Sequence, residues 1–206
     1  MGSRAYPPRK QRRGRGVARR KSRKLPEIPP WAEIVQLLEA TGRQRDRLML
    51  MLGAFMGLRV SEIVKLQVPH LDFGRAMLYV RGGKGDADRA VPIPDFLHGP
   101  LRGWIGARRT GPVFTSRKGG GPLTTRGVQH LLKRVAQKAG LPDALKARKY
   151  HPHVLRHAAA CRWLETDGTT IYDVKELLGH SNVAVTERYL HTTPQRLANV
   201  VNGGPR

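Results

Sequence analysis

The run Leu48–Met56 limits the possible folds of this chain more than any other feature, because its residues are apolar almost all round a helix. It belongs to a segment from about Gln44 to Met56 that is typical of one helix. A helix with apolar side chains on every side is stable in water only when other elements surround it. We therefore expect this helix at the centre of a mainly helical domain.

Helical periodicity predicts further helices on both sides of the central one. Trp31, Ile34, Val35, Leu37 and Leu38 form one apolar stripe, so a helix should begin at Trp31. Thr124 or Thr125 is a candidate cap for a helix that ends near Ala139, before Gly140. The remaining helices are expected at about 60–66, 95–106, 152–165, 171–178, 182–190 and 194–201.

The pattern changes between residues 76 and 93. Segments 76–80 and 89–93 are typical of strands, and the glycine-rich stretch 82–86 between them is typical of a hairpin tip. Segment 113–115 is a third, short candidate strand. The chain is therefore predicted to be mainly α with a small antiparallel β-sheet.

Positive charge is concentrated at the N-terminus. The formal net charge is +23, and residues 1–24 hold eleven Lys or Arg and no acid. Such a segment is expected to be a disordered basic arm, followed by a linker at 25–30 and one domain at 31–206. That domain is basic in its own right, so the partner should be a polyanion, most simply nucleic acid. The arm is expected to contact DNA phosphates through Arg12, Arg13, Arg15, Arg19, Arg20 and Lys21. The alternative is that the arm is only a solubilising tail.

Several classes of protein are excluded. The one cysteine, Cys161, cannot form an internal disulfide, which argues against a disulfide-stapled secreted scaffold. The sequence contains no run of about 20 apolar residues that could span a bilayer, and the charged N-terminus leads into prolines rather than into a signal peptide. We expect a cytoplasmic, nucleoid-associated protein with no membrane partner.

Five segments carry side chains suited to phosphate chemistry. Arg59 falls at a turn between two helices, and Glu62, one turn later, can orient it. His153 and Arg156 are three residues apart, so they share one helix face. Lys84 lies at the glycine-rich hairpin tip, His180 follows a predicted helix end, and Tyr189 lies on a late helix.

These residues together could cleave a phosphodiester without a metal. Tyr189 would attack the phosphorus and form a covalent link, while Arg59 and Arg156 would hold its oxygens with forked hydrogen bonds. Lys84 would protonate the leaving 5′ oxygen, and His153 and His180 would hydrogen-bond the phosphate. The sequence has no phosphate-binding loop of the nucleotide-hydrolase type, so no cofactor is expected. His153 and His157 are spaced like metal ligands, but no acidic third ligand accompanies them, so no metal is expected.

The order of these segments resembles the tyrosine recombinase (phage integrase) family. Its fingerprint Arg…Lys…His-x-x-Arg…His/Trp…Tyr is matched over roughly 31–200 by Arg59, Lys84, His153, Arg156, His180 and Tyr189. The resemblance implies a catalytic domain with helices around a three-stranded sheet. It also implies a site-specific recombinase or integrase that forms a 3′-phosphotyrosyl intermediate on double-stranded DNA. The family further implies a homo-tetramer on DNA, with a monomer possible off DNA, and a last helix that docks onto a neighbouring subunit.

One departure concerns the N-terminal side. Family members usually carry a separate helical domain there that closes around DNA, and residues 1–24 are too short and too charged to be that domain. Two explanations stay open: an excised catalytic fragment, or a minimal member whose arm replaces the missing half.

Alternatives remain for individual residues and for the function. Arg81 or Arg89 could take the role given to Lys84, and Tyr79, Tyr150 and Tyr172 compete with Tyr189. We expect Tyr79 on a strand, Tyr150 in a loop and Tyr172 in helix packing. The competing functions are a non-catalytic DNA-binding regulator with the same fold and a DNA-relaxing enzyme that resembles type IB topoisomerases.

Overall fold

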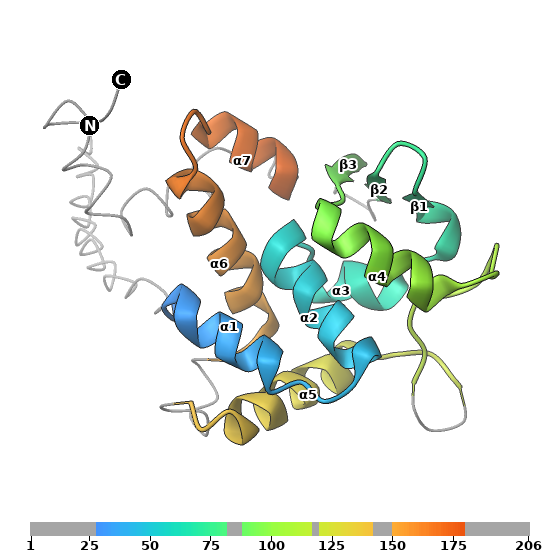
Figure 1. Cartoon of the computed structure of the whole chain (residues 1–206), viewed down its shortest axis with the longest axis horizontal. Coiled ribbons are helices and arrows are strands. Elements are labelled where there is room, and N and C mark those ends of the chain that lie inside the picture. Colours follow the sequence, from blue (N-terminus) through green and yellow to red (C-terminus); the bar gives the residue numbers. More distant parts are fainter. Residues whose placement is uncertain (1–27, 82–87, 117–119, 142–149, 180–206) are drawn as a thin grey trace, which may run out of the picture.

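The computed structural model describes residues 28–81, 88–116, 120–141 and 150–179 (Figure 1). In this part of the chain, helices greatly outnumber strands. In order they are α1 (Trp31–Glu39), α2 (Gln44–Met56), α3 (Val60–Lys65), the 3₁₀ helix η1 (Val68–His70), β1 (Leu71–Asp72), β2 (Met77–Val80), β3 (Arg89–Pro92), α4 (Asp95–Ile105), α5 (Thr125–Lys138), α6 (Pro152–Glu165) and α7 (Ile171–Leu178).

Helix α2 occupies the centre, as the apolar run Leu48–Met56 predicts. It contacts α1, α3, α4 and α6, which lie around it in Figure 1. Leu50 and Leu52 have no exposed surface, although they point to different sides of the helix. The hydrophobic core is therefore built around α2, and the turn at its C-terminal end lies deep in the molecule.

Helix α6 packs closely along α2. A Cβ atom placed on Gly53 would lie only 3.2 Å from Cβ and Cδ1 of Leu155. A side chain at position 53 would therefore push the two helices apart, because cores are packed without spare space. This contact brings Arg156, the next residue of α6, to the C-terminal end of α2.

The sheet has three antiparallel strands in the order β1-β2-β3. Leu78 in β2 pairs with Leu71 of β1 on one side and with Val91 of β3 on the other. All three side chains are buried, so one face of the sheet belongs to the core. Strands β2 and β3 confirm the two strands predicted at 76–80 and 89–93, and residues 82–87 connect them.

The prediction of a strand at 113–115 is wrong. The backbone of Val113 bonds elsewhere: its amide donates to Leu66, and its carbonyl accepts from the Trp104 indole. On either side of it, Pro112 forms an isolated β-bridge with Gln67, and Thr115 forms one with Pro122. The apolar side chains of Val113 and Phe114 thus pack in the hydrophobic core. The third strand of the sheet is β1.

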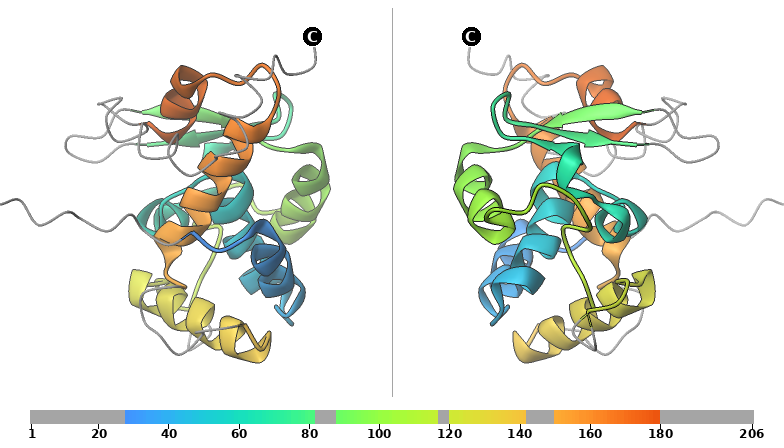
Figure 2. Two further views of the ribbon diagram at one scale, coloured as in Figure 1. Left: turned by 90° about the vertical axis from the view of Figure 1, so that its left-hand side faces the viewer. Right: turned by 90° about the vertical axis from the view of Figure 1, so that its right-hand side faces the viewer.

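Helix α7 lies beside the sheet. It contacts β3 and α6, and Figure 2 shows it against the strands at one end of the molecule, with α5 at the other end. Thr170 caps its N-terminus by accepting from the amide of Asp173 and in turn donates to the Asp173 carboxylate. Gly179 follows its last turn.

The helices expected at 44–56, 152–165 and 171–178 are confirmed with those bounds. Thr124 is the cap of α5. The helices expected at 182–190 and 194–201, and the arm at 1–24, lie outside the described residues. Across the residues that the structure describes, no helix is long and apolar enough to cross a membrane.

Candidate active site

A tight turn separates α2 from α3 and carries Arg59. Gly57 ends α2 with a φ of 62°, a backbone conformation that glycine adopts without strain. A Cβ atom there would lie 2.8 Å from the Trp163 ring of α6 and 3.0 Å from Leu178 of α7. The turn can therefore pass between α6 and α7 only with glycine at position 57, and it places Arg59 at the start of α3.

Glu62 holds Arg59 in two ways. Its Oε2 atom accepts from the Arg59 amide at 2.7 Å, and its Oε1 atom lies 3.2 Å from Nη1 of the same arginine. A carboxylate that bonds the amide before the first turn of a helix satisfies a donor that has no partner inside the helix. The predicted role of Glu62 in orienting Arg59 agrees with this geometry.

Arg89 is the second partner of Glu62. It opens β3, and its Nη1 and Nη2 atoms donate to Oε1 and Oε2 of Glu62, both at 2.8 Å. Its Nε atom donates to the carbonyl of Leu177 in the last turn of α7, at 2.9 Å. The Arg89 side chain is only 6% exposed, so it lies inside the site rather than on its rim.

Arg156 approaches from α6. Its Nη1 atom donates to the Gly57 carbonyl at 2.7 Å, and its Nη2 atom donates to the Leu178 carbonyl. These carbonyls lie at the C-terminal ends of α2 and α7, where helices leave acceptors without internal partners and where positive charge is favoured. Nη1 of Arg156 also lies 4.0 Å from Oε2 of Glu62. Arg59 and Arg156 therefore converge on one carboxylate.

The cluster of Arg59, Glu62, Arg89 and Arg156 carries an excess of positive charge. Burial of the Glu62 carboxyl opposes its ionisation. The hydrogen bonds and charge of Arg89, the Arg59 amide and the charge of Arg156 outweigh that effect, so the pKa of Glu62 lies below its usual 4.5. Glu62 is thus ionised at neutral pH, and three guanidinium groups surround a single negative charge. This surplus suits a phosphate group.

His153 lies one turn before Arg156 on α6, on the exposed side of the helix. Its ring is 6.0 Å from that of His151, which precedes the helix. Burial, together with the charge of His153, lowers the pKa of His151 below its usual 6.5. His153 and Arg156 therefore lie on one helix as predicted, but His153 is exposed whereas Arg156 is buried.

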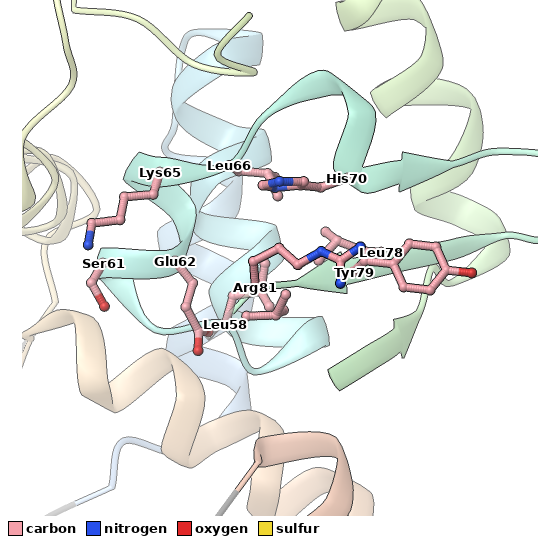
Figure 3. Close-up of a pocket in the computed structure, with 10 residues that line it drawn as sticks. Leu58, Ser61, Glu62, Lys65, Leu66, His70, Leu78, Tyr79 and Arg81 are labelled. Carbon is pink, nitrogen blue, oxygen red and sulfur yellow. The ribbon is translucent and has the colours of Figure 1, made fainter. Parts of the chain in front are cut away.

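A cavity of about 330 Å³ adjoins the cluster and shares Glu62 with it (Figure 3). Ser61, Glu62 and Lys65 line it from α3, and Tyr79 and Arg81 line it from β2 and its end. Hydroxyl, ammonium and guanidinium groups thus border a recess beside the three arginines. Such a border can bind an anionic chain that continues beyond the cluster.

Three residues of the predicted site lie outside the described residues: Lys84, His180 and Tyr189. The same holds for the arm cations Arg12, Arg13, Arg15, Arg19, Arg20 and Lys21. The chain nonetheless leads from β2 into the segment with Lys84, and His180 directly follows Gly179 at the end of α7.

The competing residues have other surroundings. Tyr79 lies on β2, as expected. Tyr150 is buried and donates to the Glu33 carboxylate of α1. Tyr172 is 68% exposed, so the prediction that it packs between helices is wrong; it lies on the outer side of α7. Arg81 pairs with Asp88 at 2.8 Å, and Arg89 pairs with Glu62.

The sequence indicates Arg89 only as a substitute for Lys84, and its pairing with Glu62 was not predicted. These residues are 27 positions apart in the chain, and no periodic pattern links them. The available signal is the position of Arg89, a long charged side chain at the first residue of a predicted strand. Among the described residues, no group of three His, Cys, Asp or Glu side chains could hold a metal ion.

Comparison with known proteins identifies the family of the chain. The sequence model of the phage integrase family matches residues 31–196. The tyrosine recombinase XerA of Thermococcus kodakarensis is 39% identical over 181 residues, which cover 85% of this chain and 61% of that protein. The tyrosine recombinase XerC of Xylella fastidiosa is 37% identical over 185 residues, which cover 86% of this chain and 60% of that protein. The chain spans about three fifths of the length of these relatives.

Solved structures show the same fold. A crystal structure of XerA recombinase matches with a TM-score of 0.75 and 27% identity, over 88% of this chain and 66% of that one. The XerH site-specific recombinase bound to its palindromic difH substrate, in a post-cleavage complex, matches with a TM-score of 0.69 and 26% identity, over 86% of this chain and 53% of that one. This chain therefore belongs to the phage integrase family and has the fold of a tyrosine recombinase catalytic domain.

Proposed function

We propose that this chain is a site-specific DNA recombinase or integrase that cleaves and rejoins strands through a covalent 3′-phosphotyrosyl intermediate. One observation carries the proposal: Arg59 and Arg156, from helices α3 and α6, meet at the Glu62 carboxylate. Two guanidinium groups in one place can hold both non-bridging oxygens of a phosphodiester. Their charge then stabilises the additional negative charge of the transition state.

In the proposed reaction, the phenol oxygen of Tyr189 attacks the scissile phosphorus and passes its proton to His153. The bond from phosphorus to the 5′ oxygen breaks, and Lys84 protonates that oxygen. His153 and His180 also hydrogen-bond the phosphate. The 3′ end remains esterified to Tyr189. Rejoining is the reverse step: a 5′ hydroxyl attacks the phosphotyrosine and restores both the diester and the phenol, so neither metal nor cofactor is required.

The proposed substrate is double-stranded DNA. A chain of net charge +23 attracts a polyanion, and the similar XerH site-specific recombinase was solved with its palindromic difH substrate. In this proposal residues 31–206 form the catalytic domain, 25–30 form a linker, and the arm 1–24 contacts the backbone near the site. The protein acts as a homo-tetramer on DNA, can be a monomer away from it, and is found with the nucleoid.

A covalent-trapping assay tests the proposal. The chain is incubated with labelled duplexes of randomised sequence that carry a nick, so that the short fragment with the new 5′ hydroxyl is released and the adduct accumulates. Protein-linked label on a denaturing gel is expected, and sequencing the trapped DNA identifies the target. Tyr189→Phe should form no adduct while it still binds DNA. Tyr172→Phe is the matched control, because that exposed phenol lies far along α7 from its C-terminal end, and it should react like the wild type.

Three outcomes would contradict parts of the proposal. Adduct formation by Tyr189→Phe would exclude Tyr189 as the nucleophile. Binding without any adduct would favour a non-catalytic DNA-binding regulator of the same fold. Relaxation of supercoiled plasmid by a monomer, without strand exchange, would favour a DNA-relaxing enzyme.

A further inference from the structure

Arg89 connects three parts of the structure with one side chain. Two of its nitrogens bond both oxygens of Glu62 in α3, at 2.8 Å each, and its third bonds the Leu177 carbonyl of α7 at 2.9 Å. Arg89 itself belongs to β3. The sheet, α3 and α7 therefore meet at a single guanidinium group.

Only an arginine can make these three bonds at once. Its planar head group donates in parallel to two carboxylate oxygens while Nε points in another direction. A lysine at position 89 would keep the charge but would place one nitrogen where three are needed. The contacts thus depend on the shape of the side chain as well as on its charge.

The surroundings leave the Arg89 side chain little room to move. It is 6% exposed, and a Cβ atom on Gly179 would lie 2.9 Å from its Cδ atom. Glycine at the end of α7 therefore allows the arginine to pass. At the same helix end, Arg156 bonds the Leu178 carbonyl, so successive carbonyls of α7 are held by two different arginines.

The positions of these contacts in the chain relate them to the proposed chemistry. Arg89 comes five residues after Lys84, Glu62 comes three residues after Arg59, and Leu177 comes three residues before His180. Each end of the Arg89 network is thus joined by a short stretch of backbone to a residue proposed to touch the phosphate.

We propose that Arg89 is a positioning residue, which fixes β3 and the C-terminal end of α7 relative to Glu62 and Arg59. This inference rests on the proposed function. Arg89 does not contact the phosphate in this role. It acts through Glu62 and through the backbone of Leu177, so that groups from three elements reach one phosphorus atom together.

The test measures cleavage and binding separately in the full chain. Arg89→Lys should cleave nicked DNA about 100-fold more slowly, because a small misplacement of reacting groups can reduce the rate by a factor of that order. Its affinity for DNA should be unchanged. Arg89→Gln should be slower still. The matched control is Arg108→Gln: Arg108 also bonds three backbone carbonyls, those of Trp104, Ile105 and Pro112, but at the end of α4. It should cleave at the wild-type rate.

A pH profile separates positioning from a general loss of structure. Glu62 faces three cations: Arg59 at its own helix, Arg89 from β3 and Arg156 from α6. Arg89→Gln removes the partner that most lowers the pKa of this buried carboxyl, so the pKa should rise. The loss of cleavage in acid should then begin at a higher pH in Arg89→Gln than in the wild type, and a double variant that also carries Glu62→Gln should lack this displacement of the profile.

The outcomes distinguish this inference from the proposed function. If wild type and Arg108→Gln form the adduct and Arg89→Lys forms it equally fast, Arg89 has no positioning role, although the enzyme proposal stands. The inference also fails if Arg89→Gln shows the wild-type pH profile or if its loss of rate follows its loss of folded protein. Absence of adduct in the wild type would instead overturn the enzyme proposal.

Discussion

Arg156 and Gly57 are 99 residues apart in the chain, yet Nη1 of the arginine donates to the glycine carbonyl at 2.7 Å. The same guanidinium group reaches the Leu178 carbonyl with its other terminal nitrogen. Arg156 therefore closes the C-terminal ends of two helices while it borders the candidate active site. Its head group is held in place before any phosphate arrives, which is the condition for electrostatic stabilisation without reorganisation.

Replacing Arg156 by lysine should reduce stability as well as cleavage. One ammonium group cannot serve both carbonyls, and a buried acceptor without a partner costs about 1–3 kcal/mol. Urea unfolding should show a loss of this size. Arg162→Lys on the same helix, where the arginine lies 4.5 Å from the Trp31 ring centre, should cost about 0.5 kcal/mol or less. Equal losses in the two variants would contradict the prediction.

Gly57→Ala should destabilise the domain strongly. The left-handed backbone at this residue costs an L side chain about 1–3 kcal/mol, and the new Cβ atom would also meet the Trp163 ring at 2.8 Å. Gly103→Ala is the control, because Gly103 lies inside α4 with nothing within 4 Å of its Cβ position. That variant should gain up to about 1 kcal/mol from helix propensity. A thermal melt compares the two with the wild type.

Glu62 should make stability depend on acid pH. Its pKa is lower in the folded chain than its usual 4.5, so the unfolded chain binds the proton more readily. The stabilisation is complete above that usual value and is lost as the pH falls through it toward the folded pKa. The unfolding free energies of wild type and Glu62→Gln should therefore converge as the pH is lowered from 6 to 3. Most of the change is expected from about pH 5.5 downward, that is, from about one unit above the usual pKa. A constant difference would show that the folded and unfolded pKa values are equal.

Tyr150→Phe should affect the fold and spare the chemistry. The phenol donates to the Glu33 carboxylate and ties the start of α6 to α1, and hydrogen bonds to charged groups contribute about 1.5–3 kcal/mol. Chemical denaturation should detect a loss of this order. Adduct formation at a temperature where the variant is folded should equal that of the wild type. If the folded variant formed no adduct, Tyr150 would again be a candidate nucleophile.

Deletion of residues 1–24 should flatten the salt dependence of DNA binding. Each cation that neutralises a phosphate releases a counterion, so the slope of affinity against salt concentration reports the number of such contacts. The deleted segment holds eleven cations. Titrations at several salt concentrations measure the slope, and equal slopes for both chains would show that the arm does not bind DNA.

Local patterns are sufficient to predict most helices of this domain. The all-round apolar run predicts α2, helical periodicity predicts α6 and α7, and all three helices have the predicted bounds. The family fingerprint likewise brings Arg59, His153 and Arg156 into one hypothesis, and Arg59 and Arg156 meet at Glu62.

Structural features that depend on contacts between residues far apart in the chain cannot be predicted from local sequence patterns. Strand β1 has two residues, too few to alternate between faces, and it pairs only because β2 folds back over it. The apolar pair at 113 and 114 is typical of a strand but is buried among helices. The Arg89–Glu62 pairing joins a strand to a helix 27 residues away, and neither element alone suggests it.

A Cβ atom at position 53 would lie only 3.2 Å from Leu155, and this has a consequence for which substitutions the domain can accept. Gly53 precedes Gly57 by one helical turn and Leu155 adjoins Arg156, so the spacing of two core helices also sets the separation of the guanidinium groups. A methyl group added at this point would act as a wedge. Substitutions at this point of the interior are therefore limited by the geometry of Arg59 and Arg156 as well as by the volume of the core.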